Sequence, residues 1–385
     1  MNRLNIENLK NFQHYLHEFQ KSSRRATKNS NIKITFDKKY GKQIRIDDVK
    51  IAIDHWNPAA DLIFFSHPHM DHIPNIPKKS LKQIKDRVLK RPLFICSKIS
   101  KEIAELRTRK KFSFPGSMWL LGNNLNLKSS VDYKGLTLSL IENGHTYGSC
   151  SLFIEGSERI FYTSDFTGND KFLNTPFTAL RGLKPLECEH LITECTYGLP
   201  KYIFPSFPEL SMNINQNIQN NLLLNIPTII LAYSYGKSQT ILNSLNPSFN
   251  ILLEKSIAKI VKKLEALDLS FNSWQPYGKY NKNQLMKLRD YVLIIPPYEM
   301  FKEPYKTLIA DGANVIYLSG KTFSSDARER FPADHYYPYS DHCDYNQLID
   351  FVQNTNPEHI YLEHGNMSAF YYALNKLDIT PNSEI

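Results

Sequence analysis

The stretch Ser66-His67-Pro68-His69-Met70-Asp71-His72 brings three imidazoles and one carboxylate together within six residues of the chain. It directly follows the apolar run 62–65, which predicts a strand that ends where these side chains begin. Imidazole and carboxylate groups are the ligands that Zn²⁺ and similar divalent ions favour, and open positions on such ions activate water. A polar turn after a strand would account for one such residue but not for four. The stretch therefore predicts half of a two-metal hydrolytic site.

The overall composition is that of a folded protein. With 385 residues, 42% of them apolar, the chain can form two domains or one large domain with an insertion. Residues 1–20 contain no secretory signal and space Leu9, Phe12, Leu16 and Phe19 along one helical face, so we predict a docking helix within an extension of residues 1–30. We expect no membrane span. Five cysteines without a CxxC pair argue against a disulfide framework and favour a reducing, cytoplasmic setting.

The net charge of +9 is unevenly distributed. Residues 1–50 carry +7 and residues 78–111 carry +10, so the rest of the chain is acidic. A basic segment beside the histidine-rich loop suits a nucleic-acid substrate, because each neutralised phosphate releases counterions. Within it, Arg107 and Arg109 are candidates for substrate contacts. A solvated basic helix face is the alternative interpretation.

Short strands alternate with helices along most of the chain. The residue pattern predicts strands at 32–36, 44–46, 49–53, 62–65, 136–141, 151–154, 159–163, 228–232, 315–318 and 360–362. Helical spacing predicts helices over 81–89, 100–106 and 209–223. The character changes near residue 202, where the sequence becomes Asn-rich, and strand–helix alternation returns after 315–318. We therefore predict an α/β fold in which residues 201–315 are inserted into a domain formed by 31–200 and 316–385.

Further metal-ligand side chains stand at other predicted strand ends. His145 follows the strand at 136–141, Asp165 follows the strand at 159–163, and His364 follows the strand at 360–362. His342 lies in another polar stretch. Each is weak evidence alone, since a histidine beside a glycine is usually an ordinary loop residue. Together, in this chain order, they supply the ligands that a second metal needs.

Three more stretches complete a set of motifs: Leu191-Ile192-Thr193-Glu194-Cys195-Thr196-Tyr197-Gly198, Ser340-Asp341-His342-Cys343-Asp344-Tyr345 and Leu362-Glu363-His364-Gly365. With the histidine-rich loop, His145 and Asp165, they resemble the metallo-β-lactamase-fold hydrolases and, within them, the β-CASP branch of nucleic-acid nucleases. The resemblance runs from about residue 30 to 375. It implies a metallo-β-lactamase αββα sandwich with an inserted α/β β-CASP domain. The most similar subgroups are the mRNA 3′-end-processing-like nucleases and the DNA-ligase-associated exonucleases.

The resemblance also implies roles for the metal-ligand side chains. His67, His69 and His145 would bind one metal, Asp71, His72 and His364 would bind the other, and Asp165 would bridge them. The implied cofactor is a pair of Zn²⁺ ions, with Mn²⁺ as an alternative. Two such ions can activate water for in-line attack at phosphorus and stabilise the attacking and leaving oxygens, so Asp71 counts among the catalytic residues too.

His342 is the expected general acid, because an imidazole that is not bound to metal can protonate a departing alkoxide. Glu194 would orient His342 and hold its proton, and a structural hydrogen bond is the alternative for Glu194. Cys343, next to His342, could suggest a Cys-His nucleophile, but we expect it to be a small buried apolar residue.

The stretch Tyr235-Gly236-Lys237-Ser238 suggests a phosphate loop, but Leu231 stands where the GxxxxGKS motif requires a glycine. A strand-to-helix turn there can still offer backbone N–H groups and the ammonium of Lys237 to a phosphate. Tyr235 and Lys237 are therefore candidates for substrate binding, with a plain helix start as the alternative.

The expected function is two-zinc hydrolysis of phosphodiester bonds in single-stranded nucleic acid, with RNA slightly favoured. The alternative is a DNA 5′-3′ exonuclease of the ligase-associated type that acts in DNA repair. A small-molecule hydrolase acting on thioesters or lactams, and a catalytically inactive binding subunit, are further alternatives. A ligase, a helicase or a processing complex could be the partner, and the helix in residues 1–30 could support a homodimer.

Overall fold

The computed structural model describes residues 32–37, 41–85, 92–110, 118–119, 129–377, 379 and 382–383. Its first sheet contains β1 (Ile32–Asp37), β2 (Gly41–Ile46), β3 (Val49–Ile53), β4 (Leu62–Phe64), β5 (Leu93–Ile95) and β6 (Met118–Trp119) in that spatial order. β1, β2 and β3 are antiparallel neighbours, and β3 to β6 run parallel. The strand that precedes the histidine-rich loop, β4, therefore lies near the centre of this sheet.

The second sheet has the spatial order β19-β18-β11-β10-β9-β8-β7. Its strands are β7 (Ser129–Tyr133), β8 (Leu136–Glu142), β9 (Cys150–Glu155), β10 (Arg159–Tyr162), β11 (His190–Glu194), β18 (His359–Glu363) and β19 (Asn382–Ser383). β7 to β10 form an antiparallel meander, whereas β10, β11 and β18 are parallel. Strands that precede the inserted part and strands that follow it thus meet in this sheet.

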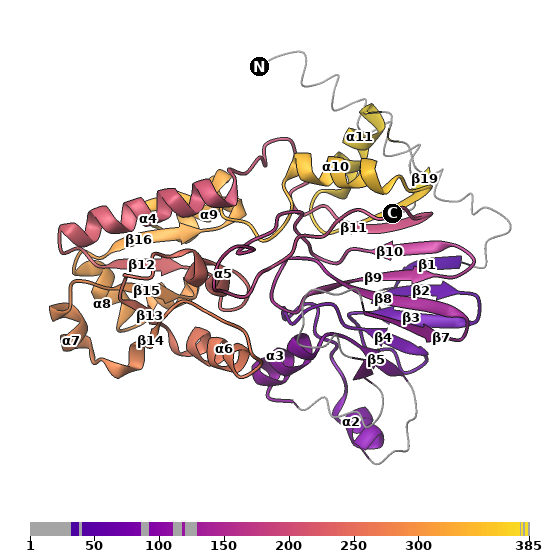
Figure 1. Cartoon of the computed structure of the whole chain (residues 1–385), viewed down its shortest axis with the longest axis horizontal. Coiled ribbons are helices and arrows are strands. Elements are labelled where there is room, and N and C mark those ends of the chain that lie inside the picture. Colours follow the sequence, from indigo (N-terminus) through magenta and orange to yellow (C-terminus); the bar gives the residue numbers. More distant parts are fainter. Residues whose placement is uncertain are drawn as a thin grey trace.

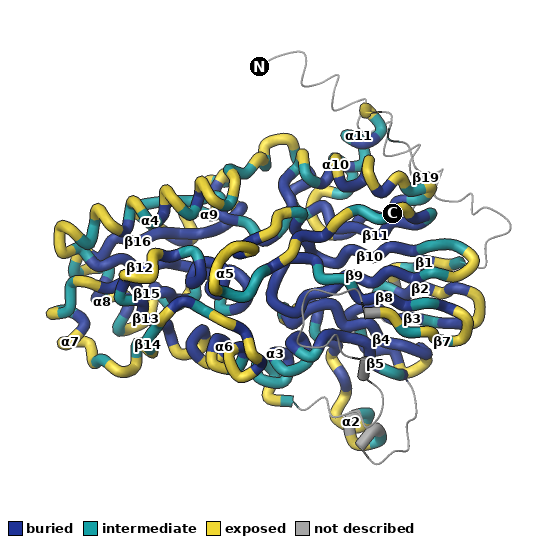
Figure 2. Tube along the Cα trace, in the orientation of Figure 1, coloured by how far each residue is buried: buried dark blue, intermediate teal, exposed yellow. Residues whose placement is uncertain are grey.

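The two sheets pack face to face around one apolar core (Figures 1 and 2). Side chains alternate along each strand, so Leu62 and Phe64 point into that core while Ile63 points to the outer face, toward Ala104 of α3 (Lys98–Thr108). On the other outer face, α10 (Tyr345–Thr355) and α11 (Met367–Lys376) pack against the second sheet. These layers form the predicted αββα sandwich. A short helix, α2 (Lys78–Lys85), precedes β5.

The inserted part contains one sheet of parallel strands with helices on both faces. The spatial order is β14-β13-β15-β12-β16-β17, formed by β12 (Thr228–Leu231), β13 (Ile251–Leu253), β14 (Gln275–Pro276), β15 (Val292–Ile295), β16 (Asn314–Leu318) and β17 (His335–Tyr337). The central strands are apolar on both faces, as parallel strands covered on both sides require.

The helices of the insertion are α4 (Phe207–Leu223), α5 (Lys237–Ser244), α6 (Lys255–Glu265), α7 (Lys282–Lys287), α8 (Tyr305–Ala310) and α9 (Ser325–Arg330), with 3₁₀ turns η1 (Tyr277–Lys279), η2 (Pro297–Phe301) and η3 (Gly320–Phe323). Helices α4, α5 and α6 cover one face of the sheet, and α7, α8 and η2 cover the other. The expected α/β insertion is confirmed. None of the helices in the described part of the chain combines the length and apolar character that crossing a membrane requires.

The predicted end of the insertion at residue 315 is wrong. β16 crosses that boundary and β17 lies beyond it. In the inserted sheet, however, β16 pairs with β12 and β17 pairs with β16. The chain returns to the sandwich only after β17. Strand–helix alternation looks alike in both parts, so its return after residue 315 could not indicate which sheet the next strand joins. The predicted docking helix in residues 1–30 lies outside the described residues.

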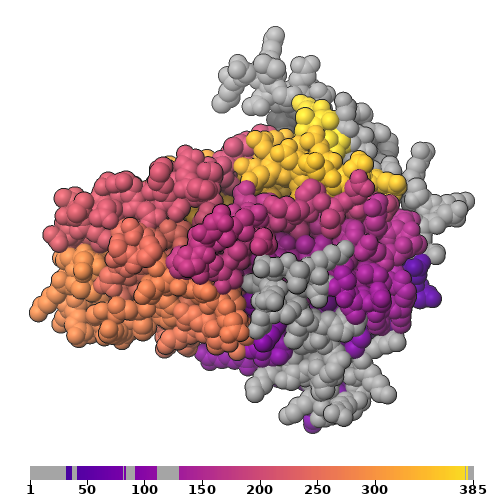
Figure 3. Space-filling model, viewed as in Figure 1, coloured from indigo at the N-terminus to yellow at the C-terminus, as the bar shows by residue number. Residues whose placement is uncertain are grey.

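The insertion lies directly against the sandwich (Figures 1 and 3). An apolar cluster joins Ile99 and Ile103 of α3 to Ile260 and Leu264 of α6, with Tyr235 from the loop after β12 among them. This contact places the loops of the insertion over the strand ends of the sandwich, where the histidines lie.

Candidate metal centre

Strand ends from both sheets of the sandwich bring the candidate ligands together. The histidine-rich loop follows β4, and His145, Asp165 and His364 follow β8, β10 and β18. Two residues here, Ser164 (φ 56°) and His364 (φ 57°), adopt the left-handed backbone conformation that non-glycine residues seldom take. Such conformations persist where the surroundings impose them, often at functional sites.

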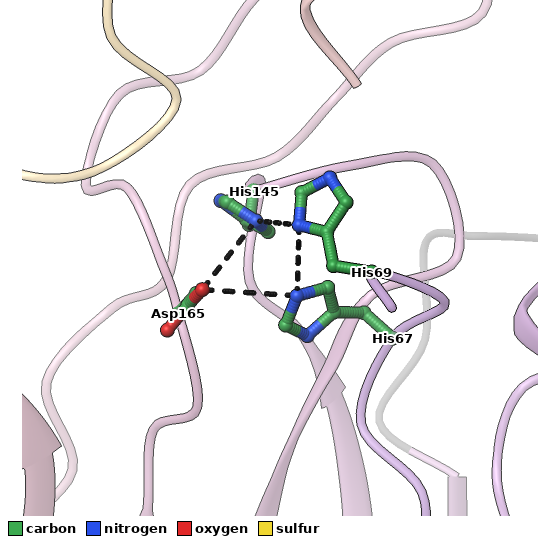
Figure 4. Close-up of side chains that lie close together, drawn as sticks. All are labelled: His67, His69, His145 and Asp165. Atoms are coloured by element: carbon green, nitrogen blue, oxygen red, sulfur yellow. Dashed lines mark hydrogen bonds and ion pairs between the residues drawn. The ribbon is translucent and has the colours of Figure 1, made fainter. Parts of the chain in front are cut away.

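Four ligand atoms converge in the first cluster (Figure 4). His69 Nδ1 lies 3.0 Å from His67 Nε2 and 3.1 Å from His145 Nε2. Asp165 Oδ2 lies 3.7 Å from both His67 Nε2 and His145 Nε2. Neighbouring ligands around a tetrahedral zinc ion with bonds of about 2.0–2.1 Å are about 3.3 Å apart. The spacing of the four atoms therefore suits ligands of one common ion.

Backbone carbonyls determine which ring nitrogens carry hydrogen. His69 Nε2 lies 3.3 Å from the Tyr235 carbonyl, and His145 Nδ1 lies 3.1 Å from the Asp341 carbonyl. A carbonyl can only accept, so these two nitrogens are the N–H donors. The opposite nitrogens, His69 Nδ1 and His145 Nε2, then direct lone pairs at each other across 3.1 Å. A cation between the two nitrogens would accept both lone pairs and remove this repulsion. A hydrogen bond from the other ring nitrogen to a carbonyl is typical of metal-bound histidines.

A second cluster shares Asp165 with the first. His72 Nε2 lies 3.7 Å from Asp165 Oδ2, and His364 Nε2 lies 4.0 Å from Asp165 Oδ1. His72 Nδ1 is hydrogen-bonded to Asp54 Oδ2 at 2.8 Å, so its Nε2 faces the cluster. The expected ligand Asp71 is less closely placed: its side chain is 76% exposed, with Oδ2 3.8 Å from His72 Nε2. The structure thus brings all the predicted ligands to one place, with Asp71 at the edge.

The donor set fits a divalent ion. Asp165 Oδ1 is buried and has no hydrogen-bond partner among the described residues. Burial, followed by the neighbouring histidines, holds the pKa of His67 and His145 well below the usual value. Burial also lowers the pKa of His69, to about 4, despite its carbonyl partner. Neutral imidazoles are the form that binds metal. The cluster can therefore bind metal as it stands.

Asp54, which the sequence analysis missed, supports the second cluster. It follows β3 directly, with φ 50°, and accepts hydrogen bonds of 2.7 Å from both the backbone and the hydroxyl of Ser66. Burial alone would lower the pKa of His72, but the hydrogen bond to Asp54 and the charge of Asp165 outweigh it and raise that pKa to about 9. An ion that binds His72 Nε2 must therefore displace a proton. The sequence did offer a signal for Asp54, because it is an aspartate at the end of the strand that precedes the strand of the histidine-rich loop.

The partly exposed His342 and the buried Glu194 form a pair beside the clusters. His342 Nδ1 lies 2.8 and 2.9 Å from the two carboxylate oxygens of Glu194, which also accepts the backbone N–H of Phe166 at 2.8 Å. Burial would lower the pKa of His342, but the charge and hydrogen bonds of Glu194 outweigh it and raise that pKa. Because Nδ1 is bound to Glu194, Nε2 is the nitrogen left to exchange a proton. The neighbouring Cys343 is buried in the apolar core, as expected.

A cleft of about 630 Å³ opens onto these groups between the sandwich and the insertion. Its lining includes His69, Asp71, Asp165, His342 and His364. The described residues that line it also include Arg107, whose Nη1 donates to the Pro68 carbonyl at 2.7 Å, but not Arg109. Arg109 is an exposed residue at the end of α3. Of the two predicted arginines, only Arg107 is at the cleft.

Two other predicted substrate contacts, Tyr235 and Lys237, line the cleft, but their polar side-chain groups have partners within the protein. The Tyr235 side chain is 2% exposed and its hydroxyl donates to the Tyr147 carbonyl. Its backbone carbonyl accepts from His69, and its ring packs beside the His69 ring, with centroids 5.8 Å apart. Lys237 begins α5, and its Nζ lies 3.3 Å from Asp341 Oδ2 and donates to the Tyr339 carbonyl at 3.0 Å. An ammonium with these partners is not free for a phosphate. The alternative, a plain helix start, describes Lys237 better.

Asp341 is the second residue that the sequence analysis missed. Its carboxylate lies 3.3 Å from the ammonium of Lys171, in the loop after β10, and 3.3 Å from that of Lys237 in the insertion. Its carbonyl holds His145. The position beside His342 was a signal for Asp341, whereas no pattern in the sequence indicates Lys171.

Comparisons with known proteins agree with this geometry. Residues 333–377, which contain His342 and His364, match the family model described as a Zn-dependent metallo-hydrolase RNA specificity domain. Among similar proteins are a probable DNA ligase from Opitutus terrae (27% identity, covering 60% of this chain and 22% of that protein) and the 5′ exonuclease Apollo of Rattus norvegicus (24%, 81% and 53%). An RNase J-like protein of Methanocaldococcus jannaschii is 22% identical over 80% of this chain and 82% of that protein.

The chain is similar to nucleases of the β-CASP branch of the metallo-β-lactamase-fold proteins. A crystal structure of a protein of unknown function from Enterococcus faecalis has the same fold, with a TM-score of 0.54 and 14% sequence identity over 87% of this chain and 94% of that chain. The chain spans only about a fifth of the length of the probable DNA ligase and about half of the length of the Apollo exonuclease.

Proposed function

We propose that this protein is a two-zinc nuclease that hydrolyses phosphodiester bonds in single-stranded nucleic acid. The observation that carries the proposal is that two ligand clusters and the His342–Glu194 pair open onto the same cleft. A hydrolase of small thioesters or lactams would need the metals but not a separate proton donor held by a buried carboxylate. The relatives named as exonuclease and RNase support the same substrate class.

The residues that would hold the two ions follow from the clusters. His67, His69 and His145 would bind the first ion, His72, His364 and Asp71 the second, and Asp165 would be shared between them. When bound, such ions supply an activated water and stabilise charge on the phosphoryl oxygens. Mn²⁺ is an alternative ion, because imidazole and carboxylate ligands also suit it.

His342 would donate the proton that the leaving oxygen requires. Its raised pKa favours the protonated ring, and Glu194 fixes the ring through both carboxylate oxygens. A proton given up at Nε2 leaves a neutral imidazole that still donates from Nδ1 to Glu194. General acid catalysis of this kind contributes roughly 10²–10⁴-fold to a rate.

Single-stranded RNA and single-stranded DNA both remain candidate substrates. The family model that matches residues 333–377 is described as an RNA specificity domain, which favours RNA. The relatives named as a 5′ exonuclease and a probable DNA ligase favour DNA processing, with the ligase as a candidate partner. Arg107 and Lys321 line the cleft and supply positive charge for either backbone.

The test is turnover of matched 5′-labelled RNA and DNA oligonucleotides, with and without a chelator. We expect cleavage of at least one of them, loss of cleavage in the chelator and recovery on adding Zn²⁺ or Mn²⁺. Thioester and lactam substrates serve as controls. Hydrolysis of those substrates with both oligonucleotides left intact would contradict the proposal.

A further inference from the structure

Exposed aromatic side chains gather at one edge of the inserted sheet. Among the described residues, the Phe and Tyr side chains that are exposed are Phe36, Tyr233, Tyr298, Phe301 and Phe323. Phe36 lies on β1 of the sandwich. The other four follow the ends of three neighbouring strands, Tyr233 after β12, Tyr298 and Phe301 in η2 after β15, and Phe323 in η3 after β16. Large rings exposed by about half are therefore concentrated in one place.

The topology explains why these loops meet. β15, β12 and β16 are adjacent and parallel, so their carboxyl ends lie at the same edge. From β12 the chain first forms strands on one side and then crosses to β16 and β17 on the other. In open α/β sheets, ligands bind outside the carboxyl ends of the strands at such a reversal. The aromatic loops occupy that position.

This edge is continuous with the metal cleft. Tyr233, Ser319 and Lys321 line the cleft as well as belonging to the loops after β12 and β16. Tyr233 contacts the hydroxyl of Tyr317, and the Tyr317 ring packs on Phe331 with centroids 5.3 Å apart. The same Phe331 supports Tyr298 at 5.0 Å and Phe301 at 6.4 Å. The buried rings of Tyr317 and Phe331 thus lie beneath the exposed rings and connect Tyr233, at the cleft, with Tyr298 and Phe301 farther from it.

Cationic side chains are interleaved with these rings. The Arg330 guanidinium lies 5.1 Å from the centre of the Tyr298 ring, and Arg330 also donates to the Tyr298 hydroxyl. Lys321 adds a charge at the cleft. The acidic residue within η2, Glu299, is paired with Lys302 at 2.6 Å. Aromatic faces that accept bases, beside cations that accept phosphates, are the combination that binds single strands without sequence preference.

We propose that Tyr233, Tyr298 and Phe301, with Arg330, form a stacking platform for the bases of a single-stranded nucleic acid that extends from the metal cleft over the insertion. The platform rests on the proposed nuclease function, because it places the part of that substrate beyond the bond that is cut. A protein partner would suit exposed rings too, but the cations and the continuity with the cleft favour a polyanionic strand.

The test compares Tyr298→Ala and Phe301→Ala with wild type in fluorescence anisotropy, using the metal-loaded full chain. The probes are phosphorothioate RNA and DNA of about 4 and about 16 nucleotides, so that only the longer one can reach Tyr298 and Phe301, the part of the platform outside the cleft lining. Each variant should weaken binding of the long probe about 5- to 100-fold and leave the short probe unchanged. Tyr298→Phe, which keeps the ring, should bind as wild type. Phe36→Ala removes an exposed ring elsewhere and is the matched control.

Arg330→Ala provides an independent readout. For the long probe only, log affinity should fall less steeply with log salt concentration, with a slope smaller in magnitude by about 1, because one phosphate contact is lost. Wild-type affinity of both alanine variants for the long probe would overturn the platform and leave the rings as a surface for a protein. Equal losses on both probes would overturn it too, since the effect would then lie in the cleft. Binding does not require cleavage, so a wild type that binds long probes by this surface but cuts no oligonucleotide would refute the nuclease proposal alone.

Discussion

Asp341→Ala is expected to destabilise the protein strongly, because it leaves two buried lysines without their counter-ion. The Asp341 carboxylate, the Lys171 ammonium and the Lys237 ammonium are all at most 9% exposed, with N···O distances of 3.3 Å on both sides. Burial lowers the pKa of Lys171 even though Asp341 opposes that change. The two lysines come from the sandwich and from the insertion, so the carboxylate joins the two parts.

The magnitude follows from the burial. Removing one partner of a buried ion pair costs about 3–5 kcal/mol, because the remaining charge is desolvated and uncompensated. Asp341→Asn keeps the shape but not the charge, so most of this loss should remain. Lys237→Met leaves Asp341 paired with Lys171 and should cost less. The measurement is the free energy of unfolding from urea titration of the full chain.

The relative order of these variants tests the reasoning. If Asp341→Asn were as stable as wild type, the carboxylate charge would not be what holds the lysines. If Lys237→Met cost more than Asp341→Ala, packing of the lysine stem would dominate over the ion pair. Either result would refute the account of Asp341 as the link between the two parts.

Three further predictions concern single side chains. His342→Ala should retain bound metal yet lose about 10²–10⁴-fold in turnover of a natural oligonucleotide. It should keep near wild-type turnover of a p-nitrophenyl phosphodiester, because that leaving group needs no proton. Equal losses on both substrates would exclude His342 as a general acid. Burial raises the pKa of Glu142 to about 8, so the folded state loses stability as pH rises from about 4.3, the unfolded value, through 8. Glu142→Gln should therefore be more stable than wild type at about pH 9 and equal to it at about pH 4 in denaturant unfolding, and an advantage independent of pH would contradict this assignment. Tyr235→Phe keeps the carbonyl on His69, so oligonucleotide affinity and zinc content should stay unchanged, and a large loss of affinity would restore Tyr235 as a substrate contact.

The sequence was sufficient to predict the layers and the ligand positions, because both have local signals. Period-two runs predicted β8, β9 and β10 within one or two residues, and polar residues directly after apolar runs predicted where His67, His145, Asp165 and His364 lie. Strands in one sheet place their ends at a common edge, so spacing in the chain indicated proximity in space.

Contacts between the two parts could not be predicted. Nothing in the stretch 232–239 indicates that Tyr235 is buried against Tyr147 or that Lys237 pairs with Asp341, because both partners are about 90 to 100 residues distant in the chain. The requirement for Gly236 is similar: a Cβ there would lie 2.7 Å from Thr146, so only glycine lets this loop pass over the histidines. The prediction of where the insertion ends failed for the same reason, because the sheet that a strand joins depends on residues far away in the chain.

Zinc titration of metal-free protein, with turnover of a single-stranded oligonucleotide followed at each step, tests the central claim most directly. We expect turnover to rise with added Zn²⁺ and to stop rising at about two equivalents per chain, and we expect Asp165→Ala, which removes the shared ligand, to lose both binding steps and turnover together. Saturation at one equivalent, or undiminished turnover without metal, would contradict a two-metal centre at His67, His72 and Asp165.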